Sequence, residues 1–91
     1  MPIDYGNIRQ VLGIRVEIVN GSGSHLIELE LKYNTMQGWQ SSGYQTYIYQ
    51  TRPKIVYKVL DNLIKRRLVK KEVYREIRAR VKSLEKMLIS G

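Results

Sequence analysis

The spacing of the apolar residues changes once along the chain, at Pro53, and this change limits the fold more than any other feature. Between residues 11 and 51 the clearest apolar runs recur at every second position, the period of a β-strand with one buried face. After Pro53 they recur at intervals of three and four, the period of an amphipathic helix. We therefore predict an α+β fold, with an N-terminal antiparallel β-meander of about three strands followed by two C-terminal amphipathic helices.

Two strands and a hairpin are expected early in the chain. Apolar and polar residues alternate over 11–19 and again over 25–33, and the sequence Asn-Gly-Ser-Gly at 20–23 is typical of a loop. A four-residue loop would place Arg15 opposite Glu28, a favourable cross-strand pair. The residues on the outward face of this hairpin are thus expected to be paired charges at the surface.

The segment before the helices divides into a loop and a third strand. Residues 34–43 are rich in Gly, Ser, Asn and Gln, which predicts a loop, whereas 44–51 favours a strand. Thr51 and Pro53 resemble a helix start, because a threonine can cap the first turn and a proline has no N–H to lose there. The β half is therefore expected at about 11–51 and the helical half at about 53–89.

The helical half carries two apolar stripes. They comprise Ile55, Val56, Val59, Leu60, Leu63, Ile64 and Leu68, and then Val73, Ile77, Val81, Leu84 and Leu88. A single helix over this length would be about 55 Å long, so two helices in a hairpin are favoured for a compact domain. The connection resembles that of small helical hairpins and winged-helix proteins, in which glycine is more common at the position of Arg67 and Ser or Thr at that of Lys70. One long helix is the alternative, and it would require dimerisation or a partner along its second stripe.

Charge is distributed unevenly along the chain. The formal net charge is +8, but residues 1–51 carry three basic and four acidic residues, whereas residues 52–91 carry 13 basic and four acidic ones. An asymmetry of this size points to a polyanionic partner or to an acidic protein surface.

The basic residues of the helical half are predicted to form one ridge that neutralises nucleic-acid phosphates. The candidate nucleic-acid-binding residues are Lys65, Arg66, Arg67, Lys70, Lys71, Arg75, Arg78 and Lys82. The alternative is a solvated helix surface, on which Glu72 and Glu76 form ion pairs with Arg75 and Arg80.

Aromatic residues in the β half are candidates for partner binding. Trp39 is a candidate interface anchor, because tryptophan is a frequent hot spot, and Tyr47 and Tyr49 are grouped with it as partner-binding residues. Together with Tyr44 they could instead stack on unpaired bases. The alternative to both is packing on a half-buried sheet face.

Catalysis is not expected. The chain has no cysteine and a single histidine, His25, so neither a thiolate nor a histidine cluster is available for a metal, and no cofactor is expected. Glu28 and Glu30 share an outward strand face with Arg15 and Lys32 as neighbours, which favours permanently ionised surface carboxylates. The glycine-serine loop lacks the Lys-Ser/Thr ending of a phosphate-binding loop.

The length of the chain bears on the number of domains, and its hydropathy bears on its location. Ninety-one residues suit a single domain over 1–91. Neither a membrane-spanning segment nor a signal peptide is apparent, which predicts a cytoplasmic protein, and the composition is compatible with a thermophilic source.

Three functions are carried forward from the sequence. The first is a small basic protein that binds DNA or RNA, DNA being favoured, in a form that could be a homodimer. The second is an accessory subunit of a larger nucleic-acid machine, such as an archaeal DNA polymerase. The third is a regulatory or inhibitory protein that binds an acidic protein surface.

Overall fold

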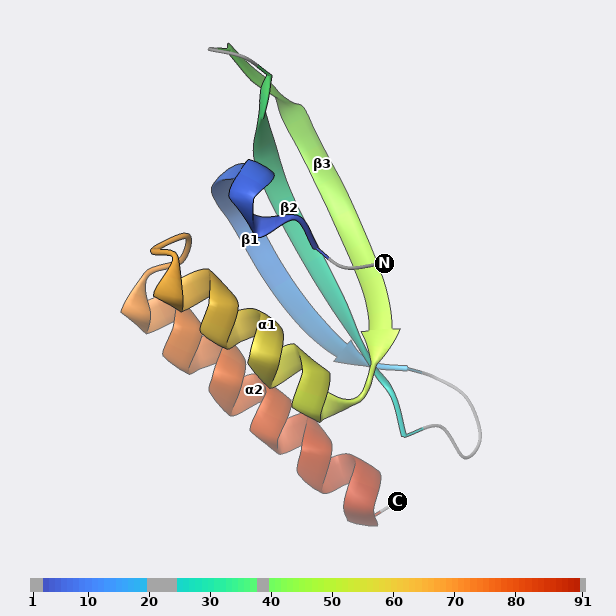
Figure 1. Cartoon of the computed structure of the whole chain (residues 1–91). Helices are drawn as coiled ribbons and strands as arrows, with labels where there is room; N and C mark the ends of the chain where they lie inside the picture. Colours follow the sequence, from blue (N-terminus) through green and yellow to red (C-terminus); the bar gives the residue numbers. More distant parts are fainter. Residues whose placement is uncertain (1–2, 20–24, 38–39, 91) are drawn as a thin grey trace.

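The computed structural model describes residues 3–19, 25–37 and 40–90, and it confirms the expected α+β fold (Figure 1). The elements are a short 3-10 helix η1 (Tyr5–Asn7), the strands β1 (Ile8–Ile18), β2 (Ile27–Gln37) and β3 (Gln40–Thr51), and the helices α1 (Pro53–Lys65) and α2 (Lys71–Ser90). The three strands form one antiparallel sheet in the order β1-β2-β3. Both helices lie on the same side of this sheet, so the molecule has two layers (Figure 1).

The core lies between the sheet and the helices. Val16 of β1 and Leu29 and Leu31 of β2 are fully or almost fully buried, because alternate strand residues face the helical layer. From the helical layer, the first apolar stripe supplies Val56, Leu60 and Leu63 of α1, and the second supplies Val81 and Leu84 of α2. The two halves of the sequence therefore share one hydrophobic core.

The loop expected over residues 34–43 is wrong, because β2 continues to Gln37 and β3 already begins at Gln40. The pairing continues through Met36 with Ser41, after a register shift between Asn34 and Met36. These strand ends extend beyond β1 and beyond the helices (Figure 1). The pairing of strand backbones does not require apolar side chains, so a segment whose composition resembles that of a loop can still form a strand.

The expected hairpin register is also wrong. Arg15 lies opposite Glu30, not opposite Glu28, because the pairing stops at Ile18 with Ile27 and the connection is longer than four residues. Arg15 Nη2 is 3.1 Å from Glu30 Oε2, so a cross-strand ion pair forms two residues further along β2 than predicted.

The start of α1 differs from the prediction in its cap. Thr51 is the buried last residue of β3 and pairs with Ile27, so it closes the sheet. Arg52 occupies the N-cap position without a side-chain cap, and its carbonyl accepts the backbone N–H of Ile55 at 2.9 Å. Pro53 stands at the first helical position, as predicted.

The two helices are separate, and a tight turn joins them. Arg67 has a positive φ of 59°, the backbone conformation that ends many helices and that favours glycine. The N–H of Arg67 donates to the carbonyl of Ile64 at 3.0 Å, and that of Leu68 donates to Leu63 at 2.9 Å. These two bonds form a Schellman motif, and the half-buried Leu68 packs on the core as its apolar contact. Glycine would adopt this backbone conformation with the least strain, but the chain has an arginine at this position.

Candidate nucleic-acid interface

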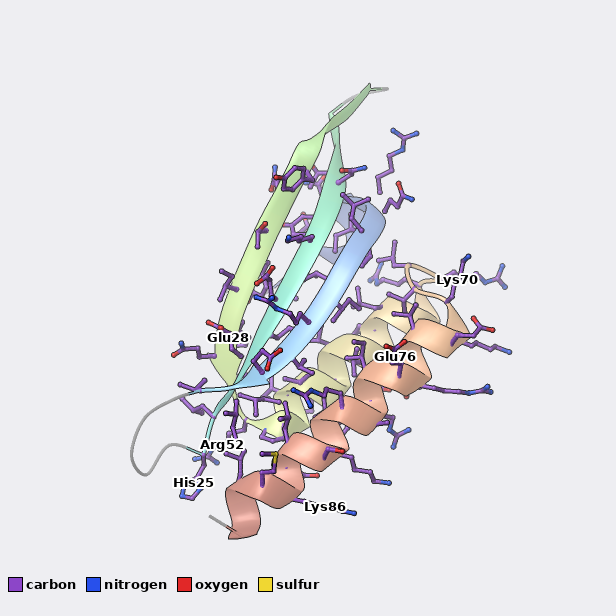
Figure 2. The ribbon with its side chains drawn as sticks, turned by 180° about the vertical axis from the view of Figure 1, so that it is seen from behind. His25, Glu28, Arg52, Lys70, Glu76 and Lys86 are labelled. Carbon is purple, nitrogen blue, oxygen red and sulfur yellow. The ribbon has the colours of Figure 1, made fainter. Side chains whose placement is uncertain are left out.

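A row of basic residues follows one face of α2. Lys71, Arg75, Arg78 and Lys82 recur at intervals of four, three and four, which places them on the same side of a helix, and all four are exposed. Lys86, four residues further on, continues the row, and Figure 2 shows it near the far end of α2. These five residues, called the α2 row below, span about 22 Å of helix at 1.5 Å per residue.

A second basic row lies on α1. Lys54, Lys58 and Lys65 are exposed and share a helix face turned away from the buried positions of α1. Of these three residues, only Lys65 belonged to the predicted set. Asp61, which is also exposed, lies on the same face of α1 between Lys58 and Lys65. The α2 row borders this face where the helices meet, since Arg78 of α2 lies over Tyr57 of α1, so the outward surface of the helical layer carries mostly basic residues.

Tyrosines occupy the contact line between the two rows. Tyr74 Oη of α2 donates to Asp61 Oδ1 of α1 at 2.7 Å, and Arg78 Nη1 donates to Tyr74 Oη at 3.4 Å. The hydrogen bond to Asp61, more than any other cause, raises the pKa of the Tyr74 hydroxyl. Asp61 is therefore held by a tyrosine and not by a residue of the basic rows.

A second tyrosine connects the helices further along the same line. Tyr57 Oη of α1 donates to Glu85 Oε1 of α2 at 3.3 Å. Burial, followed by the nearby Glu85 carboxylate, raises the pKa of Tyr57. The guanidinium carbon of Arg78 lies 5.7 Å from the centre of the Tyr57 ring, within the range of a cation–π interaction. Arg78 is thus oriented by two tyrosines.

The ion pairs of the structure lie mainly in the sheet. In the described part of the chain they join Glu30 to Arg15 and to Lys32, and Glu17 to Arg80. None of the eight predicted nucleic-acid-binding residues takes part in an ion pair among the residues described. In the alternative of a solvated helix surface, Arg80 would pair with glutamates of its own helix, but its guanidinium lies 3.3 Å from the Glu17 carboxylate of β1.

The basic residues near the turn do not form a single ridge with α2. Lys70 lies at the turn between the helices (Figure 2). Arg67 and Lys70 line a groove of about 480 Å³ against β1, which also includes Leu12. Arg66 points to another side, where its guanidinium carbon is 5.8 Å from the centre of the Tyr5 ring. The basic residues near the turn are therefore divided, and of Lys65, Arg66, Arg67, Lys70 and Lys71 only Lys71 belongs to the α2 row.

The predicted aromatic residues lie on the helix side of the sheet. Tyr47 and Tyr49 are half-buried on β3, with ring centres 5.9 Å apart and ring planes at 52°. With Tyr5 of η1 they line a groove of about 390 Å³, called the tyrosine groove below. Burial raises the pKa values of Tyr5 and Tyr47. Trp39 lies outside the described residues.

Tyr5 is the functional candidate that sequence reasoning missed. The N-terminal segment has no apolar period, so nothing in the sequence predicted its place beside β3 and α1. Tyr44, which was grouped with the other tyrosines, is 68% exposed and does not line the groove.

Other kinds of site are not apparent in the described residues. His25 is exposed, and across 3–19, 25–37 and 40–90 no three His, Cys, Asp or Glu residues gather in a way that could hold a metal ion. No helix in these ranges combines the length and the apolar character needed to cross a bilayer. Comparisons of the chain with known protein families, with curated proteins and with solved structures give no match.

Proposed function

We propose that this chain is a small nucleic-acid-associated protein that contacts backbone phosphates through the outward surface of its helical layer. The observation that carries the proposal is the α2 row. Within the described residues, Lys71, Arg75, Arg78 and Lys82 share one helix face and have no carboxylate partner. A polyanion supplies the negative charge that this face lacks.

The repulsion between like charges in the α2 row supports a role in binding. Like charges four residues apart on a helix destabilise it by about 0.2 to 0.5 kcal/mol per pair. The α2 row contains such pairs at Lys71 with Arg75 and at Arg78 with Lys82. Phosphates placed along the row would remove this repulsion and would release condensed counterions, which is the main source of non-specific affinity for nucleic acid.

The turn supports the same proposal. A residue other than glycine in the left-handed region costs about 1 to 3 kcal/mol, and such strain is concentrated at functional sites. Arg67 accepts this cost with a φ of 59°. A positive charge at the end of the helical layer offers a reason for arginine at this position.

The proposal is tested by duplex DNA and RNA binding, measured as fluorescence anisotropy across a salt series. We expect a steep loss of affinity with salt. Replacing Lys71, Arg75 and Lys82 with glutamine should reduce the slope of log K against log salt by about 2 to 3, because each phosphate contact contributes about 0.9.

The matched control removes three positive charges from the β half. Arg9→Gln, Arg15→Gln and Lys32→Gln change the net charge by the same amount, and we expect the salt slope of this variant to stay close to that of wild type. Equal effects of the two triple variants would contradict the placement of the interface, because they would show that only the total charge matters.

A second candidate function, that of an accessory subunit, is favoured by the groove between β1 and the turn. Leu12 and Val73 line it and are 49% and 37% exposed, which gives this side of the molecule an apolar surface next to basic residues. A larger nucleic-acid enzyme such as a polymerase would dock there while the basic rows face its nucleic-acid path. Leu12→Asp should then abolish co-purification with the polymerase without changing the salt slope of the isolated protein.

A further inference from the structure

We infer that the interface accepts single-stranded nucleic acid, with an unpaired base held in the tyrosine groove. This inference rests on the proposed function, because the same basic surface is needed to hold the phosphates. It adds a substrate class that the basic rows alone do not specify, since phosphates are present in single strands and duplexes alike.

The tyrosine groove is built from three separate elements. Tyr5 comes from η1, Tyr47 and Tyr49 come from β3, and Val59 and Ile55 of α1 contribute apolar surface. Its volume of about 390 Å³ lies within the range of about 300 to 1,000 Å³ that small-molecule sites occupy. A space of this size suits a single base and its sugar and is too small for a duplex.

The tyrosines are suited to stacking. Tyr5, Tyr47 and Tyr49 are half-buried, so each ring is fixed by packing and still partly accessible. The rings of Tyr47 and Tyr49 are tilted by 52° and therefore do not cover each other in a parallel stack. Aromatic rings in such positions bind the face of any base, without requiring a particular sequence.

The groove is continuous with the basic surface. Lys58 lines the groove and is also the middle residue of the α1 row, between Lys54 and Lys65. At the other side, Arg66 lies over the ring of Tyr5. A nucleic-acid strand whose phosphates follow the α1 row would therefore have a base within reach of the tyrosines. In a duplex the base is paired and stacked, and it would first have to flip out.

The experiment compares single-stranded DNA, single-stranded RNA and the matching duplex DNA by anisotropy at one salt concentration. We expect tighter binding to at least one of the single strands than to the duplex. Tyr47→Leu and Tyr49→Leu, made together, should weaken single-strand binding about 5- to 100-fold, the loss that removal of base stacking produces, and should leave duplex binding unchanged.

Two controls separate stacking from folding. Tyr47→Phe with Tyr49→Phe keeps the rings and should restore single-strand binding, whereas Tyr44→Leu removes an exposed tyrosine of the same strand from outside the groove and should have no effect. If the leucine variant does not fold, photo-cross-linking of wild type to an oligonucleotide that contains 5-bromouracil replaces it. Cross-links should then map to Tyr5, Tyr47 or Tyr49.

The outcomes distinguish the two proposals. Equal binding of single strands and duplex, unchanged single-strand binding by the leucine variant, or cross-links confined to α2 would overturn the inference and leave the proposed phosphate contact in place. An absence of binding to every nucleic acid at low salt would overturn both.

Discussion

Two basic residues of the sheet are paired with a carboxylate, whereas four basic residues along one face of α2 are not paired within the described part of the chain. In the sheet, Arg15 and Lys32 both lie beside the carboxylate of Glu30, at 3.1 and 3.8 Å. On α2, basic residues follow one another along a face where, among the described residues, no carboxylate pairs with Lys71, Arg75, Arg78 or Lys82. The difference teaches that net charge alone is a poor guide to a binding surface, and that the pairing of each charge is a better one.

The sheet and the helical layer are not independent folding units, because one hydrophobic core joins them. Leu60 of α1 is fully buried in that core with Leu29 and Leu31 of β2. Leu60→Ala is expected to reduce the free energy of unfolding by about 2 to 5 kcal/mol, the largest effect predicted here. Urea unfolding followed by circular dichroism and by aromatic fluorescence should give coincident transitions. Separate transitions would show that the layers fold on their own.

The turn permits a test in which charge and strain are separated. Arg67→Gly relieves the left-handed backbone and should raise the free energy of unfolding by about 1 kcal/mol. Arg67→Ala removes the same charge but keeps the strain, so it should give no such gain. Because both variants lose the same positive charge, their nucleic-acid affinities should equal each other. A gain in stability from both would mean that charge repulsion, and not the backbone, limits stability at this turn.

Among the residues that the structure describes, the ion pair between Arg80 and Glu17 joins the sheet to the helical layer. Both side chains are about half exposed, so Arg80→Gln should cost at most about 1 kcal/mol. Glu17 lies opposite Glu28 in the sheet, and the loss of Arg80 leaves these like charges uncompensated. The effect should therefore disappear in high salt, which chemical unfolding with and without added salt would show. An effect that salt does not change would indicate lost packing.

The smallest of the predicted effects is a change in the free energy of unfolding with pH. The pKa of Tyr74 is raised above its ordinary value of 10.0, so the folded chain keeps this proton at a pH where the unfolded chain has released it. Its contribution is present below pH 10 and is lost as the pH rises through the folded-state pKa. The stability difference between wild type and Tyr74→Phe should therefore shrink as the pH rises through that range, as thermal unfolding would measure. A difference that stays constant would contradict the role of Asp61.

The sequence was sufficient for the elements but not for their connections. The period of two in β1 and β2 and the stripes of α1 and α2 follow from the burial of one face, so these elements could be predicted. The register of Arg15 depended on the length of a loop, which composition does not determine. Residues 34–37 and 40–43 have the polar composition of a loop, but β2 and β3 continue through them because the pairing of strand backbones does not depend on apolar side chains.

The candidate site was predictable where it follows a helix and not where it depends on packing. Lys71, Arg75, Arg78 and Lys82 share a face for reasons of spacing alone. The direction of Arg66 depends on Tyr5, which is far away in the sequence and carries no periodic signal. The same holds for the tyrosine groove, because the spacing of two between Tyr47 and Tyr49 places them on one strand face but does not show what lies beside it.

The side chain of Arg78 has less conformational freedom than those of its neighbours in the α2 row. Its guanidinium already rests on Tyr57 and donates to Tyr74, so part of its side-chain entropy is given up on folding. Immobilising a long, free side chain at an interface costs about 0.5 to 1.5 kcal/mol. Lys71 and Lys82 would incur that cost when a phosphate arrives, and Arg78 would incur less of it. The middle of the α2 row is therefore pre-organised, whereas its flanks can adapt to phosphates at variable spacing.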